Sequence, residues 1–262
     1  MKLCVERSGT GPALVLWHGW GLNLRIFDGL RDALASEFEI IAVDLPGHGA
    51  SQWLAGMDSE AQLSALLQSV PEGAALLGWS LGGQFALRAA LRSPAQISRL
   101  ILIATTPRFT NGAAWSYGLD AAVLDGFALR LRADWAGTVQ DFLELQVRGG
   151  AESGLALSAL RAALDAHGRG DPAALGAGLE LLANTDLRPL LPTLETPTLV
   201  MCGERDRIAP PAASRVLAQA LPHAQYLAFA RAAHTPFLTD PSAVAHAVRE
   251  FLHPLAAKQG VA

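Results

Sequence analysis

The chain has 262 residues, of which 51% are hydrophobic and 17% charged, and its formal net charge is −4. This composition excludes a disordered chain, and the negative charge gives no basic footprint for nucleic acid or anionic lipid. The two cysteines, Cys4 and Cys202, lie far apart, so the sequence shows neither a disulfide framework nor zinc-ligand spacing. No apolar stretch is long enough for a membrane span or a signal peptide, so we expect a cytoplasmic protein that does not enter a membrane.

Short apolar runs that end at turn residues predict the strands. They are residues 13–17 (ALVLW), 38–43 (FEIIAV), 74–77 (AALL), 100–104 (LILIA), 198–202 (TLVMC) and 225–229 (QYLAF), with a weaker run at 3–6. Runs that are apolar on both faces are typical of parallel strands covered by helices.

Helical patterns alternate with these runs, at about 26–36, 58–70, 81–92, 211–220 and 241–252. Repeated strand–helix units predict an α/β fold with a doubly wound, mostly parallel sheet. The stretch 111–188 differs, because it is rich in Ala and Leu with helical spacing near 120–132, 137–147, 153–166 and 172–183. We therefore expect a core of residues 1–110 and 189–262, with a helical cap of residues 111–188 inserted between late strands.

Ser80 stands at the centre of a G-x-S-x-G motif, residues 78–82. A predicted strand precedes the motif and a predicted helix follows it, which is the setting of the nucleophile elbow in α/β hydrolases. The glycines allow the sharp turn, and the following helix presents its free N–H groups to the reacting centre. The alternative is a glycine-rich turn with an idle serine.

The loop after the first strong strand, residues 18–21 (HGWG), is expected to complete an oxyanion hole. The two donors would be the backbone N–H groups of Trp20 and Leu81, the residue after the nucleophile. His18 is interpreted as a structural residue of this loop, and Trp20 could also serve simply as a core anchor.

His234 is the predicted general base. It follows the last predicted strand, as the base of this fold should, whereas His246 and His253 fall in or after the terminal helix and His48 precedes the serine.

The acid that orients the histidine should lie between serine and histidine in the chain. Asp206 and Glu204 both follow the fifth strong strand run, and the offset from Gly203 favours Asp206. We expect Arg205 and Arg207 to hold this loop by ion pairs.

Six stretches give the chain a resemblance to the pimeloyl-[acyl-carrier-protein] methyl ester esterases of biotin synthesis. They are residues 16–23 (LWHGWGLN), 43–47 (VDLPG), 77–83 (LGWSLGG), 142–146 (FLELQ), 178–182 together with 185–188 (GLELL and TDLR), and 232–237 (AAHTPF). The elbow and the histidine loop are common among α/β hydrolases, whereas the two cap stretches are more specific to this family.

The resemblance implies a serine carboxylesterase that acts on a small acyl ester and uses no metal or organic cofactor. We expect the protein to be a monomer. It implies that the acyl group is carried on acyl-carrier protein, and that Trp20, Leu81, Phe142 and Gln146 bind the substrate. Phe142 and Gln146 are four residues apart, so on a helix they share a face.

One feature departs from the family pattern. The family has basic residues beside the FLxLQ helix, and this chain has Gly137 and Asp141 there. The segment from Arg108 to Asp186 contains six arginines and ten acidic residues. Long-range attraction to an acidic carrier protein is weakened by this change.

The same residues are compatible with two other functions. The first is a short-chain carboxylesterase, or a lactone or C–C bond hydrolase, because fold and triad do not separate these reactions. The second is a ligand receptor in which the hydrolase site serves sensing with little turnover.

Overall fold

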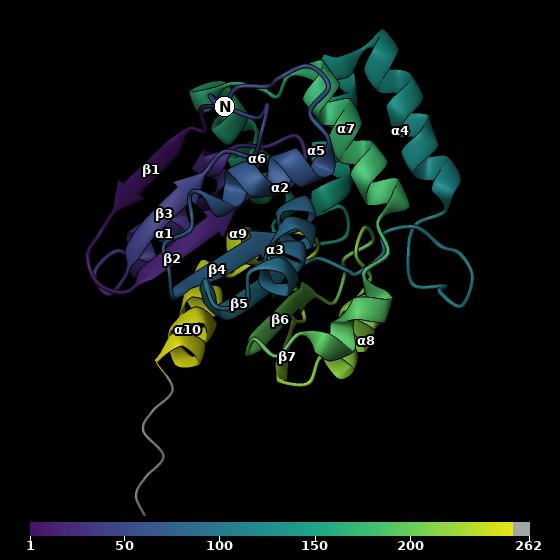
Figure 1. Ribbon diagram of the computed structural model, residues 1–262. Helices are drawn as coiled ribbons and strands as arrows, with labels where there is room; N and C mark the ends of the chain where they lie inside the picture. The colour runs from purple at the N-terminus through teal and green to yellow at the C-terminus, as the bar shows by residue number, and fades with distance from the viewer. Residues whose placement is uncertain (254–262) are drawn as a thin grey trace, which may run out of the picture.

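A twisted seven-stranded sheet forms the centre of the computed structural model, which describes residues 1–253 (Figure 1). The strands lie in the order β1-β3-β2-β4-β5-β6-β7. β1 pairs antiparallel with β3, and all other pairs are parallel. The strands are β1 (Val5–Ser8), β2 (Ala13–Trp17), β3 (Glu39–Val43), β4 (Ala74–Trp79), β5 (Ile97–Ile103), β6 (Thr198–Gly203) and β7 (Ala224–Phe229).

The central strands are buried on both faces, as their unbroken apolar runs predict. β4 and β6 are buried along their whole length, whereas β1 and β7 at the two edges alternate in exposure. β4, the strand that leads into Ser80, therefore lies in the fully buried centre of the sheet.

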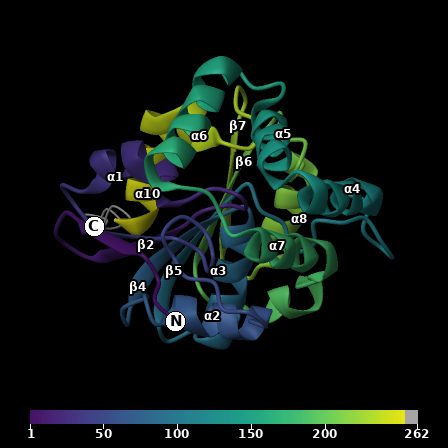
Figure 2. The same cartoon turned by 90° about the horizontal axis from the view of Figure 1, so that it is seen from above.

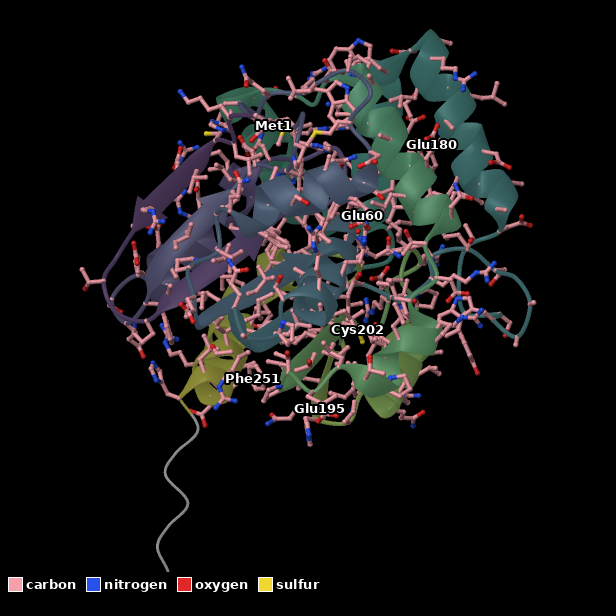
Figure 3. All side chains as sticks on the ribbon, viewed as in Figure 1. Met1, Glu60, Glu180, Glu195, Cys202 and Phe251 are labelled. Atoms are coloured by element: carbon pink, nitrogen blue, oxygen red, sulfur yellow. The ribbon has the colours of Figure 1, made fainter. Side chains whose placement is uncertain are left out.

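Helices cover both faces of the sheet. α1 (Asp28–Leu34) and α10 (Pro241–Leu252) lie on one face, and α2 (Ser59–Leu67), α3 (Leu81–Arg92) and α8 (Pro211–Ala220) lie on the other (Figure 2). Phe251 of α10 and Cys202 of β6 are labelled within the packed side chains of Figure 3, whereas the labelled Glu60, Glu180 and Glu195 are exposed. The doubly wound α/β fold predicted from the sequence is confirmed.

Four helices separate β5 from β6 in the chain: α4 (Ala121–Ala133), α5 (Trp135–Val147), α6 (Ser153–His167) and α7 (Pro172–Asn184). They gather beyond the carboxyl ends of the parallel strands (Figures 1 and 2). Asp120, Asp134 and Asp171 accept hydrogen bonds from first-turn N–H groups, so carboxylates cap the starts of α4, α5 and α7. The helical insertion is confirmed, and its treatment as a separate cap domain stays a prediction.

The predicted elements fall close to the observed ones. The differences are mostly at element ends; for example, β5 begins at Ile97 rather than at residue 100, and the N-terminal strand begins at Val5 rather than at residue 3. The expected helix at 26–36 is divided into a 3₁₀ turn, η1 (Leu24–Phe27), and α1. Among residues 1–253, no helix is long and apolar enough to cross a membrane.

Candidate active site

Ser80 lies in the turn between β4 and α3 with a backbone conformation that a serine rarely adopts. Its φ is 56° and its ψ is −117°, a strained combination that persists only where surrounding structure fixes it. The Ser80 N–H donates to the Ile103 carbonyl at 2.9 Å, and the Thr105 hydroxyl donates to the Ser80 carbonyl at 2.8 Å. β5 and the loop after it therefore hold both peptide groups of the serine.

Close packing of the turn explains the glycine at position 82. A Cβ atom there would lie 2.3 Å from the Trp17 carbonyl oxygen and 2.4 Å from that of His18. Any side chain would push α3 away from β2 and carry Ser80 with it.

The structure brings Ser80, His234 and Asp206 together from three strand ends. His234 Nε2 is 2.9 Å from Ser80 Oγ, and His234 Nδ1 is 2.8 Å from Asp206 Oδ2. All three side chains are buried. β6 and β7 are adjacent in the sheet, so the loops that carry Asp206 and His234 leave the same edge side by side.

Backbone groups fix the carboxylate of Asp206. Its Oδ1 accepts the N–H groups of Ile208 at 2.8 Å and Ala209 at 3.0 Å, which leaves Oδ2 for His234. Because Oδ2 accepts, His234 Nδ1 carries the proton and Nε2 is the acceptor for the Ser80 hydroxyl. Glu204, the other acid considered from the sequence, is exposed.

The loop of His234 is held by two contacts that the sequence did not reveal. The Trp79 indole donates to the His234 carbonyl at 2.9 Å, and the His234 N–H donates to the Gln146 carbonyl at 3.0 Å. Trp79 is the first of the two variable positions of the G-x-S-x-G motif, and through this hydrogen bond its side chain links the nucleophile turn to the histidine loop. Gln146 links the loop to α5 of the insertion.

The loop after β2 lies against Ser80. A Cβ atom on Gly19 would lie 3.2 Å from the Ser80 Cβ, which places the neighbouring Trp20 backbone at the site. Within the described part of the chain, the N–H groups of Trp20 and Leu81 donate to no acceptor. Two free N–H groups beside the serine are what an oxyanion hole requires.

His18 holds this loop in place, which confirms the predicted structural role of this residue. Its Nδ1 donates to the Gly19 carbonyl at 2.8 Å, and its Nε2 accepts the Leu45 N–H at 2.9 Å. Burial, followed by the nearby His48, lowers the pKa of His18 well below its ordinary value, so it stays neutral. Burial also lowers the pKa of His48, to about 4.

The four residues predicted to bind substrate form a buried wall over the site. The Trp20 and Phe142 rings meet edge to face with centroids 4.9 Å apart, and Trp20 donates from its indole to the Leu175 carbonyl of α7 at 2.8 Å. A Cβ atom on Gly178 would lie 2.8 Å from the Trp20 ring and 3.3 Å from Leu81. Helices α5 and α7 thus close over the nucleophile.

Gln146 is the polar member of this wall. Its side chain is 1% exposed, and neither its amide nitrogen nor its amide oxygen has a partner among the described residues. An unpaired buried amide costs free energy, and both atoms of this amide are free to bind a polar group of a ligand.

The expected ion pairs of Arg205 and Arg207 are not formed with any described residue. Arg205 instead donates to the Gly149 carbonyl at 3.2 Å. That expectation was wrong because Arg205 binds a backbone carbonyl of the α5–α6 loop and Arg207 lies next to the same glycine.

Comparison with known proteins agrees with this geometry. The family model described as the α/β hydrolase fold matches residues 12–241. The chain is 41% identical over 248 residues to the pimeloyl-[acyl-carrier protein] methyl ester esterase of Xanthomonas axonopodis pv. citri, covering 95% of this chain and 98% of that one. It is 37% identical to the protein of the same name from Nitrosospira multiformis, covering 92% and 94%.

Solved structures give the same picture. A thermophilic esterase from Thermogutta terrifontis has a TM-score of 0.80 and 27% identity, covering 97% of this chain and 94% of that one. An esterase from Exiguobacterium antarcticum has a TM-score of 0.87 at 24% identity, covering 95% of both chains, and supports the fold.

Exchange of Asp206 for asparagine tests the choice of acid. With Oδ1 bound to two N–H groups, the new amide nitrogen would face His234 Nδ1 and force the proton onto Nε2. Asp206→Asn should therefore lower kcat on a carboxylic ester by roughly 10⁴-fold, whereas the matched Glu204→Gln should leave kcat within about twofold. A large loss in Glu204→Gln with activity retained in Asp206→Asn would reverse the assignment.

Replacement of Gln146 should change stability and activity in opposite directions. Gln146→Leu removes two unpaired polar atoms, so urea denaturation should show a gain of about 1 kcal/mol in the free energy of unfolding. The same variant should lose about tenfold in kcat/KM on a substrate with a polar acyl chain. Gln140→Leu, on the same helix, is the control, and a Gln146→Leu enzyme with unchanged kcat/KM would remove Gln146 from the binding wall.

Proposed function

The chain belongs to the α/β-hydrolase fold family and, within it, to the pimeloyl-[acyl-carrier protein] methyl ester esterases, and we infer that it hydrolyses the methyl ester of pimeloyl-acyl-carrier protein in biotin synthesis. The observation that carries this conclusion is the extent of the likeness. The 41% identity covers 95% of the chain, so it runs through the helices that cover the site as well as the sheet. These helices shape the substrate pocket.

The reaction begins at the ester carbonyl. Ser80 Oγ attacks the carbonyl carbon while His234 Nε2 takes the hydroxyl proton, which its 2.9 Å contact with Oγ allows. Asp206 stabilises the imidazolium that forms, through its 2.8 Å contact with Nδ1. The N–H groups of Trp20 and Leu81 donate to the oxyanion.

The tetrahedral intermediate then expels the methoxy group. His234 returns its proton to this oxygen, so methanol leaves and the pimeloyl group stays as an ester on Ser80. A water molecule, deprotonated by His234, attacks this ester and regenerates the Ser80 hydroxyl. The sum is one methyl ester and one water converted to one carboxylate, one proton and one methanol, with the thioester to the carrier left intact.

Arginines near the site offer a docking surface for an acidic carrier. Arg205 and Arg207 both approach Gly149, and Arg148 precedes it. All three are exposed, and none forms an ion pair with another described residue. Arg231 also reaches this loop, where it pairs with Glu152 at 3.2 Å.

This group differs in position from the basic residues of the family. Gly137 and Asp141 replace those residues, and Asp141 pairs with Arg130 at 2.5 Å, which partly offsets the positive charge of that arginine. The loop at Gly149 adjoins the histidine loop, since a Cβ atom on Gly150 would lie 3.2 Å from Ala233 Cβ. A carrier docked there would hold its acyl arm next to His234. The cytoplasmic location and the monomeric state stay predictions.

Methanol release from pimeloyl-acyl-carrier-protein methyl ester tests the function. The wild-type protein should release methanol with multiple turnovers, and Ser80→Ala should release none above background. Turnover of short esters or lactones without turnover of the carrier-bound ester would favour a general esterase or lactonase. A single turnover with ligand-dependent melting would favour a receptor.

Charge reversal tests the docking surface. Arg148→Glu combined with Arg207→Glu should lower kcat/KM on the carrier-bound ester roughly tenfold at low salt, because steering by rim charges acts on association. Dimethyl pimelate, which has no carrier, should be hydrolysed at the wild-type rate. Arg132→Glu, an exposed change on α4, is the matched control. Equal loss on both substrates would indicate damage to the site, and no loss on either would place docking elsewhere.

A further inference from the structure

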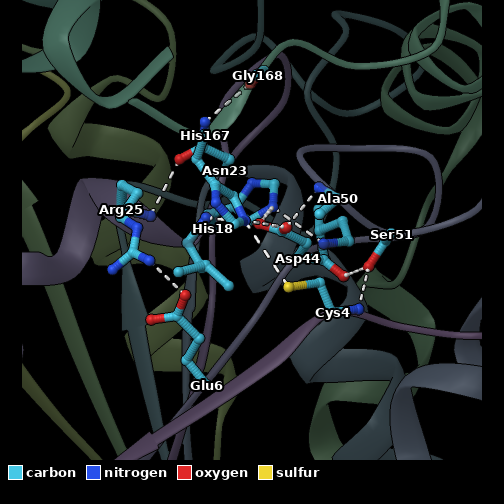
Figure 4. Close-up of polar contacts among 12 residues, drawn as sticks. Cys4, Glu6, His18, Asn23, Arg25, Asp44, Ala50, Ser51, His167 and Gly168 are labelled. Atoms are coloured by element: carbon cyan, nitrogen blue, oxygen red, sulfur yellow. Dashed lines mark hydrogen bonds and ion pairs between the residues drawn. The ribbon is translucent and has the colours of Figure 1, made fainter. Parts of the chain in front are cut away.

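Cys4, Asp44 and His167 meet at a second polar cluster outside the catalytic residues (Figure 4). Cys4 precedes β1, Asp44 follows β3, and His167 is the last residue of α6. Cys4 Sγ lies 3.8 Å from His167 Nε2, and Asp44 Oδ2 lies 2.9 Å from the same nitrogen. One ligand atom from each residue lies within 4.8 Å of the other two.

Backbone contacts hold the thiol and the carboxylate in position. The Asp44 carboxylate accepts the N–H groups of Leu24 and Ala50, each at 2.8 Å. The Cys4 N–H donates to Ser51 Oγ at 2.9 Å, and the Cys4 carbonyl accepts the Asp44 N–H at 3.0 Å. The Asp44 carboxylate and the Cys4 backbone are therefore fixed before any ligand arrives.

We propose that Cys4, Asp44 and His167 bind a zinc ion. A thiolate, an imidazole and a carboxylate are the three ligand types that Zn²⁺ takes in proteins, with bonds of about 2.0 to 2.3 Å. Such bonds in a tetrahedron put ligand atoms about 3.3 to 3.8 Å apart. The sulfur–nitrogen distance already lies at this spacing, and the nitrogen–oxygen pair must open by only a few tenths of an ångström.

The charges and the ligand set favour zinc over harder ions. A thiolate and a carboxylate carry two negative charges, which balance Zn²⁺, whereas Mg²⁺ and Ca²⁺ prefer oxygen ligands. The nearby His18 is no ligand, because both of its ring nitrogens are engaged in the loop. The His167 side chain is 14% exposed, so water can reach the fourth position.

Binding requires one proton to leave. Burial, followed by the Asp44 carboxylate, raises the pKa of the Cys4 thiol, so the thiol is protonated at neutral pH. Zinc replaces the thiol proton, which goes to solvent. Before binding, His167 Nε2 donates its proton to Asp44 Oδ2 at 2.9 Å, so this proton moves to Nδ1 when Nε2 takes the ion. Affinity should therefore fall as pH falls.

A bound ion would tie α6 to the core. The Asn23 side chain already donates to the carbonyls of Ala163 and Gly168 at 2.8 and 2.9 Å, which anchors the same end of the helix. Zinc would add a second tie from β1 and β3 and stabilise the folded state by mass action. Ser80, His234 and Asp206 take no part, so this site does not depend on the esterase reaction.

Titration of the chelator-treated full chain tests the proposal. Zn²⁺ should bind with one equivalent in calorimetry and raise the melting temperature, and Co²⁺ in its place should give thiolate-to-cobalt charge-transfer absorption. Cys4→Ala and His167→Gln should each weaken zinc binding by more than the roughly 10- to 100-fold that loss of an outer-shell partner costs. Cys4→Ala should also abolish the charge-transfer band.

The control removes a different histidine–carboxylate pair. His223 and Glu195 lie 3.0 Å apart on the surface without a thiol, so His223→Gln should bind zinc like the wild type. Loss of zinc binding in His223→Gln would overturn the proposal. Unchanged zinc binding in Cys4→Ala and His167→Gln would also overturn it, provided that both variants keep their melting temperature. Absence of one-equivalent binding in the wild type would do the same.

Discussion

The strained turn at Ser80 is the constraint on which the rest of the site depends. A non-glycine residue at this φ and ψ costs on the order of 1–3 kcal/mol. The surrounding core offsets this cost: β5 accepts the Ser80 N–H, Thr105 binds its carbonyl, and β2 packs against Gly82. The strain lifts the hydroxyl out of the sheet edge toward His234 and leaves the N–H of Leu81 free at the start of α3.

The helical insertion does more than cover this turn. Through its backbone carbonyl, Gln146 of α5 accepts the N–H of His234, and through its amide it presents two unpaired polar atoms to the same space. Trp20, whose backbone belongs to the core loop, anchors its indole on α7. One helix therefore carries two of the residues proposed to bind substrate, Phe142 and Gln146, and also a hydrogen bond to the histidine loop.

Local sequence patterns predict most of the fold and the principal residues of the site. Apolar runs such as 13–17 predict strands because a buried parallel strand has no polar face, and a strand–GxSxG–helix order predicts the turn at Ser80. Contacts between residues that are far apart in the chain cannot be predicted from such local patterns. The Trp79–His234 hydrogen bond spans 155 residues, and Cys4 meets His167 across 163 residues. The spacing of the two cysteines does not predict a zinc site, because the three ligands of the proposed site come together only when the chain folds. Arg205 likewise donates to the Gly149 carbonyl of the α5–α6 loop, a contact that the residues next to Arg205 in the sequence do not predict.

The central claim is that Ser80, activated by His234 and Asp206, forms the acyl-enzyme. Mass spectrometry of the protein after reaction with an alkyl fluorophosphonate, followed by peptide mapping, tests this claim most directly. The account predicts one adduct per chain on Ser80, with modification slowed strongly in Asp206→Asn and absent in Ser80→Ala. An adduct on another residue, or equal rates of modification in the wild type and Asp206→Asn, would contradict it.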